Sequence, residues 1–252
     1  MKHTGKLVLG AAAATVGATI VKAATFKPEK TEYPTFEPEH IDVERYKKNL
    51  SDAIQIRTVS HRDSDKVDWT KFDEFHAFLK ERYPLIHEKL SLEIIGKASL
   101  MYLWQGTDPS LDPIAMLAHQ DVVPISPGTE GDWEHDPFGG EEADGYIWGR
   151  GALDIKPHLI GVMEAVEALL EDGFVPARSV YLLFGHDEEI MSGYESGAAT
   201  MCRTLKERGV HLEAVLDEGG AILPVNVKGL LDINLDGVVV EEKGYADFEV
   251  AV

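Results

Sequence analysis

Acidic residues gather in this chain where an apolar run has just ended. In the stretch "SVYLLFGHDEEIMSG", residues 179–193, the apolar segment YLLF leads into a histidine and three carboxylates, Glu188 and Glu189 among them. Adjacent carboxylates disfavour one another's ionisation and are costly to bury without a cation. Ligands of open α/β sheets collect at the carboxyl ends of such buried strands. The cluster therefore predicts a cation site, and a metal ion is the usual cation.

Three further acidic clusters stand at comparable places in the chain. "MLAHQDVV" ends an apolar run with His119 and Asp121, "GRGALDIK" carries Asp154 in a glycine-rich loop, and "VLDEGG" ends a run with Asp217 and Glu218. Residues i and i+2 of a strand share a face, so Asp121 can accept a hydrogen bond from the His119 nitrogen that faces away from a metal. Imidazole with carboxylates suits zinc, and also manganese or cobalt.

Composition excludes several other classes of protein. The chain has 252 residues and a net charge of −20, from 24 basic and 44 acidic residues, which argues against a nucleic-acid partner. Cys202 is the only cysteine, so an intramolecular disulfide and a CxxC zinc site are excluded. Cys202 stands in a helical pattern, and we expect a buried structural thiol. A GxSxG elbow is absent from the sequence, which disfavours a serine hydrolase.

The N-terminus resembles an export signal. Lys2 and Lys6 precede an apolar, alanine-rich run over residues 7–21, which predicts a signal peptide or an uncleaved signal anchor over residues 1–24. A buried alanine-rich helix is the competing interpretation. Residues 25–40 are rich in proline and glutamate and are expected to form an extended linker. The protein is then secreted, or anchored facing an extracytoplasmic or vacuole-like compartment.

Two helical patterns open the folded part of the chain. The first places Val43, Tyr46, Leu50 and Ile54 near one face. The second begins after Asp68, a predicted N-cap. Its predicted inner stripe consists of Trp69, Phe72, Phe75 and Leu79.

Strands and helices then alternate. Strands are predicted at 90–95, 99–106, 113–124, 179–185 and 212–220, with a helix at 195–209. Residues 144–174 are predicted to form a short strand, a loop and a helix, with Pro157 near the first turn of that helix and Gly173 just past its end. This order predicts an α/β fold with a mixed, partly parallel central sheet flanked by helices. The catalytic domain is expected over residues 41–240. From residue 241 the pattern is purely β, and we expect residues 241–252 to begin a second domain.

The four acidic motifs, in this order and spacing, resemble a dizinc metallohydrolase family. That family includes carboxypeptidase S, aminoacylase, acetylornithine deacetylase and succinyl-diaminopimelate desuccinylase. The motifs "GHDEE" and "DEGG" are most similar to those of the carboxypeptidase S branch, which includes secreted N-fatty-acyl-amino-acid hydrolases. The resemblance runs from about residue 41 to the end of the chain and implies a zinc-exopeptidase-like catalytic domain.

The resemblance also implies a role for each motif residue. Asp154 would bridge two zinc ions, with cobalt or manganese as alternatives, and no organic cofactor is expected. The other implied metal ligands are His119 and Asp217 for the first ion and Glu189 for the second. Glu188 would be the general base acting on a metal-bound water, and Asp121 would support His119. The family has a cis peptide bond after the bridging aspartate, here Asp154–Ile155.

Family members continue beyond the region that this chain matches. They carry a lid or dimerisation domain and a late histidine ligand, whereas no histidine follows His211 here. We therefore expect a catalytic domain that is incomplete at its C-terminus, part of a truncated chain of a longer enzyme. A homodimer is expected only if the lid domain exists, and contact with a membrane only through the N-terminal anchor.

The leading functional hypothesis is a metal-dependent hydrolase of amide bonds next to a free carboxylate. Its substrates would be small peptides, as for a carboxypeptidase, or N-acyl amino acids. The alternative is a truncated, non-catalytic metal-binding or interaction fragment. A glycoside hydrolase with paired carboxylates would explain neither His119 nor the several acidic strand ends.

Other side chains receive structural interpretations. Lys156 and Arg150 are expected to fix the loop around Asp154, and His186 and Asp187 to have structural roles. A contact at the rim of the site is a minor alternative for His135. The histidines expected at the surface or in caps are His76, His87, His158 and His211.

Overall fold

The computed structural model describes residues 41–190 and 196–219, the backbone of strands at 222–227 and 231–236, and helical turns at 15–19, 21–22 and 25. The chain divides into two units, residues 1–40 and 41–252. Within the described residues, none of the helices combines the length and the apolar content that a membrane crossing requires. The domain boundary predicted at residue 241 lies outside the described residues, and the export signal stays a prediction.

A five-stranded mixed sheet forms the centre of the second unit. Its strands lie in the order β1-β2-β6-β3-β7. Their bounds are β1 Ser91–Ile95, β2 Ser99–Trp104, β3 Ile114–His119, β6 Val180–Gly185 and β7 Ala214–Leu216. β6 and β7 both run parallel to β3, whereas β2 is antiparallel to β6 and to β1. The carboxyl ends of β3, β6 and β7 therefore meet at one edge, which confirms the predicted fold class.

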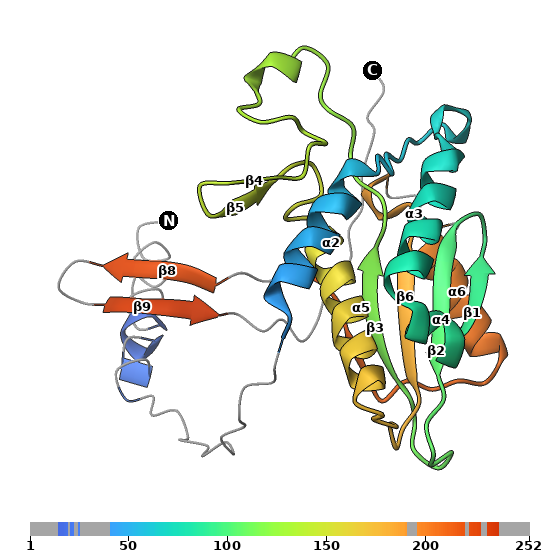
Figure 1. Cartoon of the computed structure of the whole chain (residues 1–252). Coiled ribbons are helices and arrows are strands. Elements are labelled where there is room, and N and C mark those ends of the chain that lie inside the picture. The colour runs from blue at the N-terminus through green and yellow to red at the C-terminus, as the bar shows by residue number, and fades with distance from the viewer. Residues whose placement is uncertain are drawn as a thin grey trace, which may run out of the picture. The chain divides into compact units, whose positions relative to one another are not determined.

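Helices cover both faces of this sheet. They are α2 Val43–Gln55, α3 Trp69–Arg82, α4 Pro84–Lys89, α5 Lys156–Glu171 and α6 Gly197–Glu207. α2 and α4 pack on α5, which packs on β3, and α6 packs on β1, β2 and β6. Figure 1 shows α2, α4 and α5 in front of the sheet and α6 behind it. The layers form an α/β sandwich in which each face of the sheet has its own core.

Alternation along the strands separates the two cores. On β2, Leu100 and Tyr102 join the core beneath α5, whereas Met101 contributes to the core beneath α6. On β6, Phe184 faces the first core and Leu183 the second. Because successive side chains of a strand point to opposite faces, a continuous apolar run is required where both faces are covered.

Smaller elements complete the described part of the chain. β4 Glu141–Ala143 and β5 Tyr146–Trp148 form an antiparallel hairpin, as do β8 Ile222–Val227 and β9 Leu231–Asp236. Single 3-10 turns lie at η1 Ser64–Lys66, η2 Glu130–Asp132 and η3 Glu188–Ile190.

Local signals set the helix ends as the sequence predicts. The Asp68 carboxylate accepts a hydrogen bond from the Thr70 backbone N–H at 3.1 Å and so caps α3. Pro157 stands in the first turn of α5, and Gly173 follows its end with a φ of 71°. Of the predicted inner stripe of α3, Phe72, Phe75 and Leu79 are buried, while Trp69 is only half-buried.

The prediction of burial is wrong for Cys202, and one position of a predicted helix face is exposed. Val43, at the first position of α2, is 54% exposed, whereas Leu50 and Ile54 of the same predicted face are buried. Cys202 lies in the predicted helix but is exposed. The phase of α6 turns Met201 and Leu205 toward the sheet instead.

A buried carboxylate ties the helices on the first face together. Glu164 of α5 accepts hydrogen bonds from Arg45 Nε at 2.6 Å, Asn49 Nδ2 at 2.6 Å and the Tyr83 hydroxyl at 3.0 Å. Arg45 and Asn49 belong to α2, and Tyr83 precedes α4. The network fixes α5, whose N-terminus carries the loop with Asp154.

Replacing Glu164 with alanine is expected to destabilise the fold strongly. The variant would leave a guanidinium, an amide and a hydroxyl without their shared acceptor, at a cost of about 2–4 kcal/mol in the free energy of unfolding. The control is Glu171→Ala, which removes the other carboxylate that pairs with Arg45. Because the Glu171 side chain is 48% exposed, this variant should lose under about 1 kcal/mol in the free energy of unfolding. Urea unfolding followed by circular dichroism measures both, and equal losses would contradict the assignment.

Candidate metal and catalytic site

His119 is the centre of the candidate site. It is the last residue of β3 and is 2% exposed. Its Nε2 atom lies 3.1 Å from Asp154 Oδ1, 3.7 Å from Glu188 Oε2 and 3.5 Å from Glu218 Oε1. Three further segments of the chain therefore converge on one imidazole, at the shared carboxyl edge of three strands.

Two sets of side chains have metal-binding geometry around this imidazole. Their ligand atoms lie within 4.8 Å of one another in each set. One set consists of His119, Asp154 and Glu189, and the other of His119, Glu188 and Glu218. The structure thus brings together four of the predicted site residues, His119, Asp154, Glu188 and Glu189.

Asp217 does not belong to either set, and Glu218 does. Asp217 is exposed, and its carboxylate accepts a hydrogen bond from the backbone N–H of Glu218 at 2.9 Å. β7 ends at Leu216, so the two acids follow an edge strand as consecutive residues with different directions. The sequence analysis included Glu218 in this acidic cluster but assigned the ligand role to Asp217 alone. The ligand role of Asp217 stays a prediction.

Asp121 lies beneath the site and holds two segments. His119 Nδ1 is 2.9 Å from the backbone carbonyl oxygen of Asp121 and 3.3 Å from its carboxylate. Either acceptor directs Nε2 toward the acidic cluster. The two carboxylate oxygens also accept the backbone N–H groups of Glu188 at 3.1 Å and Glu189 at 3.2 Å. Asp121 therefore contacts His119 and also fixes the turn after β6, and its supporting role in the site stays a prediction.

The loop with Asp154 is anchored from below by Lys156. The buried ammonium donates to the carbonyl oxygens of Ala53 and Ile56, both at 2.7 Å, and lies over the Phe75 ring. These carbonyl groups lie at the C-terminal end of α2, where the helix dipole favours a positive charge. The Asp154–Ile155 peptide bond is cis, as the resemblance implies.

His186 and Asp187 hold the turn between β6 and α6. His186 Nδ1 is 2.7 Å from Ser99 Oγ, and the Asp187 carboxylate accepts the backbone N–H of Gly197 at 2.8 Å. A Cβ atom on Gly197 would lie 2.0 Å from Ser99 Oγ, so this close approach requires glycine. These contacts give both residues structural roles and leave Glu188 and Glu189 to face His119.

The carboxylates raise one another's pKa in the absence of a cation. Burial raises the pKa of Glu218 to about 7, and the charges of Asp154 and Glu188 contribute to the rise. Burial also raises the pKa of Glu188 and of Glu189, as do the acids beside them. Burial alone would lower the pKa of His119, but the hydrogen bond and charge of Asp121 raise it to about 9. Such a set of donors fits a divalent cation, which would stabilise every carboxylate at once.

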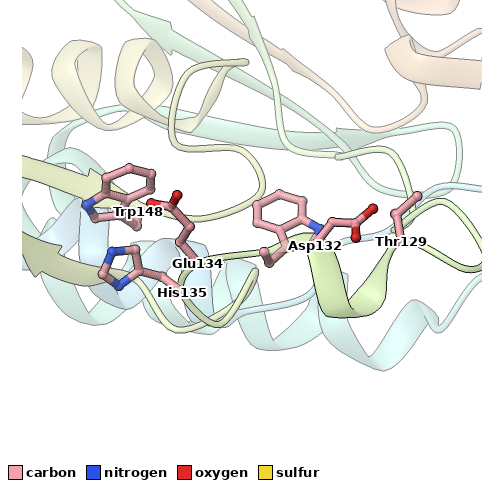
Figure 2. A pocket seen from close by; sticks show the side chains of 6 residues that line it. Thr129, Asp132, Glu134, His135 and Trp148 are labelled. Atoms are coloured by element: carbon pink, nitrogen blue, oxygen red, sulfur yellow. The ribbon is translucent and has the colours of Figure 1, made fainter.

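A pocket of about 310 Å³ lies in the loop that precedes this site. Figure 2 shows side chains that line it, and the full set is Thr129, Asp132, Trp133, Glu134, His135 and Trp148. His135 Nδ1 lies 2.8 Å from a Glu141 carboxylate oxygen, and its ring packs on Trp148 with 4.5 Å between centroids. His135 thus belongs to the packing of this loop, and Arg150 lies over the Trp133 ring.

The fold and the site define a class of protein. A mixed α/β sheet that gathers one imidazole and several carboxylates at its carboxyl edge is typical of metallopeptidases and related amidohydrolases. The sequence pattern of peptidase family M20/M25/M40 matches residues 115–250, more than half of the chain. The chain belongs to this family.

Relatives of known name support the same assignment. Carboxypeptidase S of Saccharomyces cerevisiae is 39% identical over 215 residues, which are 81% of this chain and 36% of that protein. The N-fatty-acyl-amino acid synthase/hydrolase PM20D1.1 of Danio rerio is 39% identical over 225 residues, 88% of this chain and 42% of that protein. The chain spans about two fifths of the length of the curated relatives it matches.

Solved structures share the fold. The M20 family metallo-carboxypeptidase Sso-CP2 of Sulfolobus solfataricus superimposes with a TM-score of 0.54 and 22% identity, covering 69% of this chain and 37% of that chain. The di-peptidase Dug1p of Saccharomyces cerevisiae gives a TM-score of 0.54 with 21% identity, covering 73% and 40%.

Metal binding is expected to release protons. At pH 7 a His119 with a pKa of about 9 is protonated and a Glu218 with a pKa of about 7 is half protonated. Zinc must displace these protons, so binding at pH 7 should release roughly one to two of them. The apparent zinc affinity should therefore rise as pH increases from 6 to 9. Calorimetric titration in two buffers of different ionisation enthalpy measures the release.

Glu218→Gln is the control for this prediction. Without the titrating carboxyl group the release at pH 7 should fall by about half a proton, while the contribution of His119 remains. Zinc binding that leaves the proton count unchanged at pH 7 would contradict the electrostatics described above.

Proposed function

We propose that the protein is a metal-dependent hydrolase of amide bonds that lie next to a free carboxylate. The observation that carries this proposal is the convergence of His119 with Asp154, Glu189 and Glu188 at one sheet edge. Membership of peptidase family M20/M25/M40 supports the reaction class. The names of the relatives support the kind of substrate.

The metal would be held by His119, Asp154 and Glu189, with Asp217 or Glu218 as a further ligand. We propose two zinc ions, because an imidazole with several carboxylates suits zinc, and cobalt or manganese would accept the same donors. When bound, such ions supply a water of lowered pKa and positive charge for a developing oxyanion.

Glu188 would act as the general base. Its side chain is 54% exposed and so accessible to a substrate, while its backbone N–H is fixed by the Asp121 carboxylate. The raised pKa of this half-buried carboxyl group suits a residue that must both take and return a proton. Glu188 would take a proton from the attacking water and deliver it to the amine nitrogen when the C–N bond breaks.

Two substrate classes follow from the relatives. A carboxypeptidase removes an amino acid with a free carboxylate from a peptide, and an N-fatty-acyl-amino acid hydrolase cleaves the amide of an acylated amino acid. Both reactions release an amino acid from an amide bond. We propose short peptides and N-acyl amino acids as substrates, acted on outside the cytoplasm if the N-terminal segment is an export signal.

Replacing Glu188 with glutamine is the test of the mechanism. Hydrolysis of N-acyl amino acids and of C-terminal peptide bonds should fall by about 10²–10⁴-fold, because glutamine cannot accept the proton. Zinc content, measured by atomic absorption, should persist. Glu81→Gln, an exposed glutamate of α3, is the matched control and should retain full activity.

The outcome also separates catalysis from metal binding alone. If the unsubstituted 252-residue chain binds zinc and hydrolyses neither substrate class, the alternative of a non-catalytic metal-binding fragment is favoured. If the chain hydrolyses these substrates and Glu188→Gln is equally active, the assignment of the general base is wrong.

The proposed substrate class has its own test. Each N-acyl amino acid is assayed beside the same compound with its carboxylate blocked as a primary amide. The free acid should have the higher kcat/KM, by about tenfold or more, because the loss of one charge-assisted hydrogen bond to the substrate carboxylate costs about 1.5 kcal/mol or more. Equal values for the two compounds would argue against a requirement for the free carboxylate.

A further inference from the structure

Gln120 stands between His119 and Asp121, and its side chain points away from theirs. It is 0% exposed. Its amide nitrogen donates to three backbone carbonyl oxygens, of Ala98 at 2.9 Å, Phe184 at 3.0 Å and Gly185 at 3.1 Å. Since an amide nitrogen has two hydrogens, one of them is shared between two acceptors.

The amide oxygen of Gln120 has a partner as well. It lies 2.8 Å from Nε2 of His76, on α3. An amide oxygen only accepts, so His76 Nε2 carries the hydrogen. His76 is half-buried and is therefore neither the surface residue nor the cap that its sequence context predicts. The orientation of the glutamine amide is thus specified at both of its ends.

These contacts link the C-terminal end of β3, which carries His119, to the C-terminal end of β6, which precedes Glu188 and Glu189. Ala98 precedes β2, and Phe184 and Gly185 are the last residues of β6. The backbone of Gln120 adds a bond from its N–H to the Gly185 carbonyl at 2.8 Å. The Thr58 hydroxyl donates to the Gln120 carbonyl oxygen at 2.6 Å.

Gln120 and Asp121 hold the turn after β6 at two successive points. Gln120 binds the carbonyl groups that end the strand, and Asp121 binds the N–H groups of Glu188 and Glu189 that follow it. The distance between His119 and these two glutamates therefore depends on both residues. Asp121 faces the acidic cluster, whereas Gln120 makes no contact with it.

We infer that Gln120, oriented by His76, is a positioning residue that sets the spacing between His119 on β3 and the Glu188–Glu189 turn after β6. The inference rests on the proposed function for its significance, but its physical content is the linkage of the two strand ends. A buried amide with all of its hydrogen bonds satisfied is rigid, and loss of its partners frees the backbone it holds.

The test substitutes Gln120 with leucine, which has a similar volume and no polar atoms. The first measurement is hydrogen–deuterium exchange of backbone amides in residues 184–190, which should become faster by about tenfold. The second is titration with Co²⁺, whose affinity should fall by about 10–100-fold, with a changed d–d absorption spectrum.

The matched control is Asn49→Leu. Asn49 is also a buried amide, but its side chain binds Glu164 in the helical layer and no residue of the site. This variant should be destabilised without faster exchange at 184–190 and without a change in cobalt affinity or spectrum. A loss of cobalt affinity as large as that of Gln120→Leu would mean that general destabilisation explains both.

A second pair of variants keeps the test decisive if Gln120→Leu does not fold. His76→Leu removes the hydrogen bond to the Gln120 amide oxygen, whereas His76→Gln restores a donor. We expect faster exchange at 184–190 and weaker cobalt binding in the first variant, and partial rescue of both in the second. Equal behaviour of the two variants would overturn the inference.

Failure of this inference is distinguishable from failure of the proposed function. Wild-type exchange, affinity and spectrum in Gln120→Leu would overturn the positioning role even if the protein hydrolyses amides. Conversely, a chain that binds no cobalt or cleaves no amide would refute the proposed function, and the exchange of residues 184–190 would still decide whether Gln120 links the strand ends.

Discussion

Repulsion between carboxylates is the constraint on which the rest of this structure depends. Three strands that run in the same direction end at one edge, and each delivers its following residues to the same place. The chain puts a histidine at the end of one strand and acids after the others, so several carboxylates lie around one imidazole. Folding brings these groups together against their electrostatic preference, which their raised pKa values express. A bound divalent cation would relieve this repulsion, and the relief would add to the free energy of cation binding.

A buried polar framework beneath the site resists this repulsion. Asp121 fixes the backbone of the two glutamates, and Lys156 fixes the loop with Asp154 to the end of α2. Gln120 closes the framework from the other face of the strand. Buried polar groups are tolerated when their partners are complete, and such a network specifies one arrangement of the chain. The backbone positions of these acids are therefore set by hydrogen bonds within the chain.

Family membership and geometry answer different questions about this chain. The family pattern and relatives near 40% identity establish membership of peptidase family M20/M25/M40, and solved structures near 22% identity establish only the fold. Neither decides which acid of the pair Asp217 and Glu218 faces His119. The structure brings Glu218 to the imidazole, because the register of β7 against β3 sets the direction of each residue after the strand ends. The mechanism at residue level thus depends on geometry rather than on resemblance.

The sequence by itself determined the fold class, the helix ends marked by Asp68, Pro157 and Gly173, and the identity of the acidic clusters. Apolar runs that end in charge are local signals, and so are the aspartate cap of α3 and the proline and glycine that bound α5. Only the tertiary structure decided which face of a helix is covered and which acid points inward. Val43, Cys202 and Glu218 differ from expectation for that reason. The roles of Gln120 and His76 were also invisible in the sequence, because their partners lie on segments far apart along the chain. Hydrogen bonds between distant segments leave no periodic pattern, and so they become visible only once the strands are assembled.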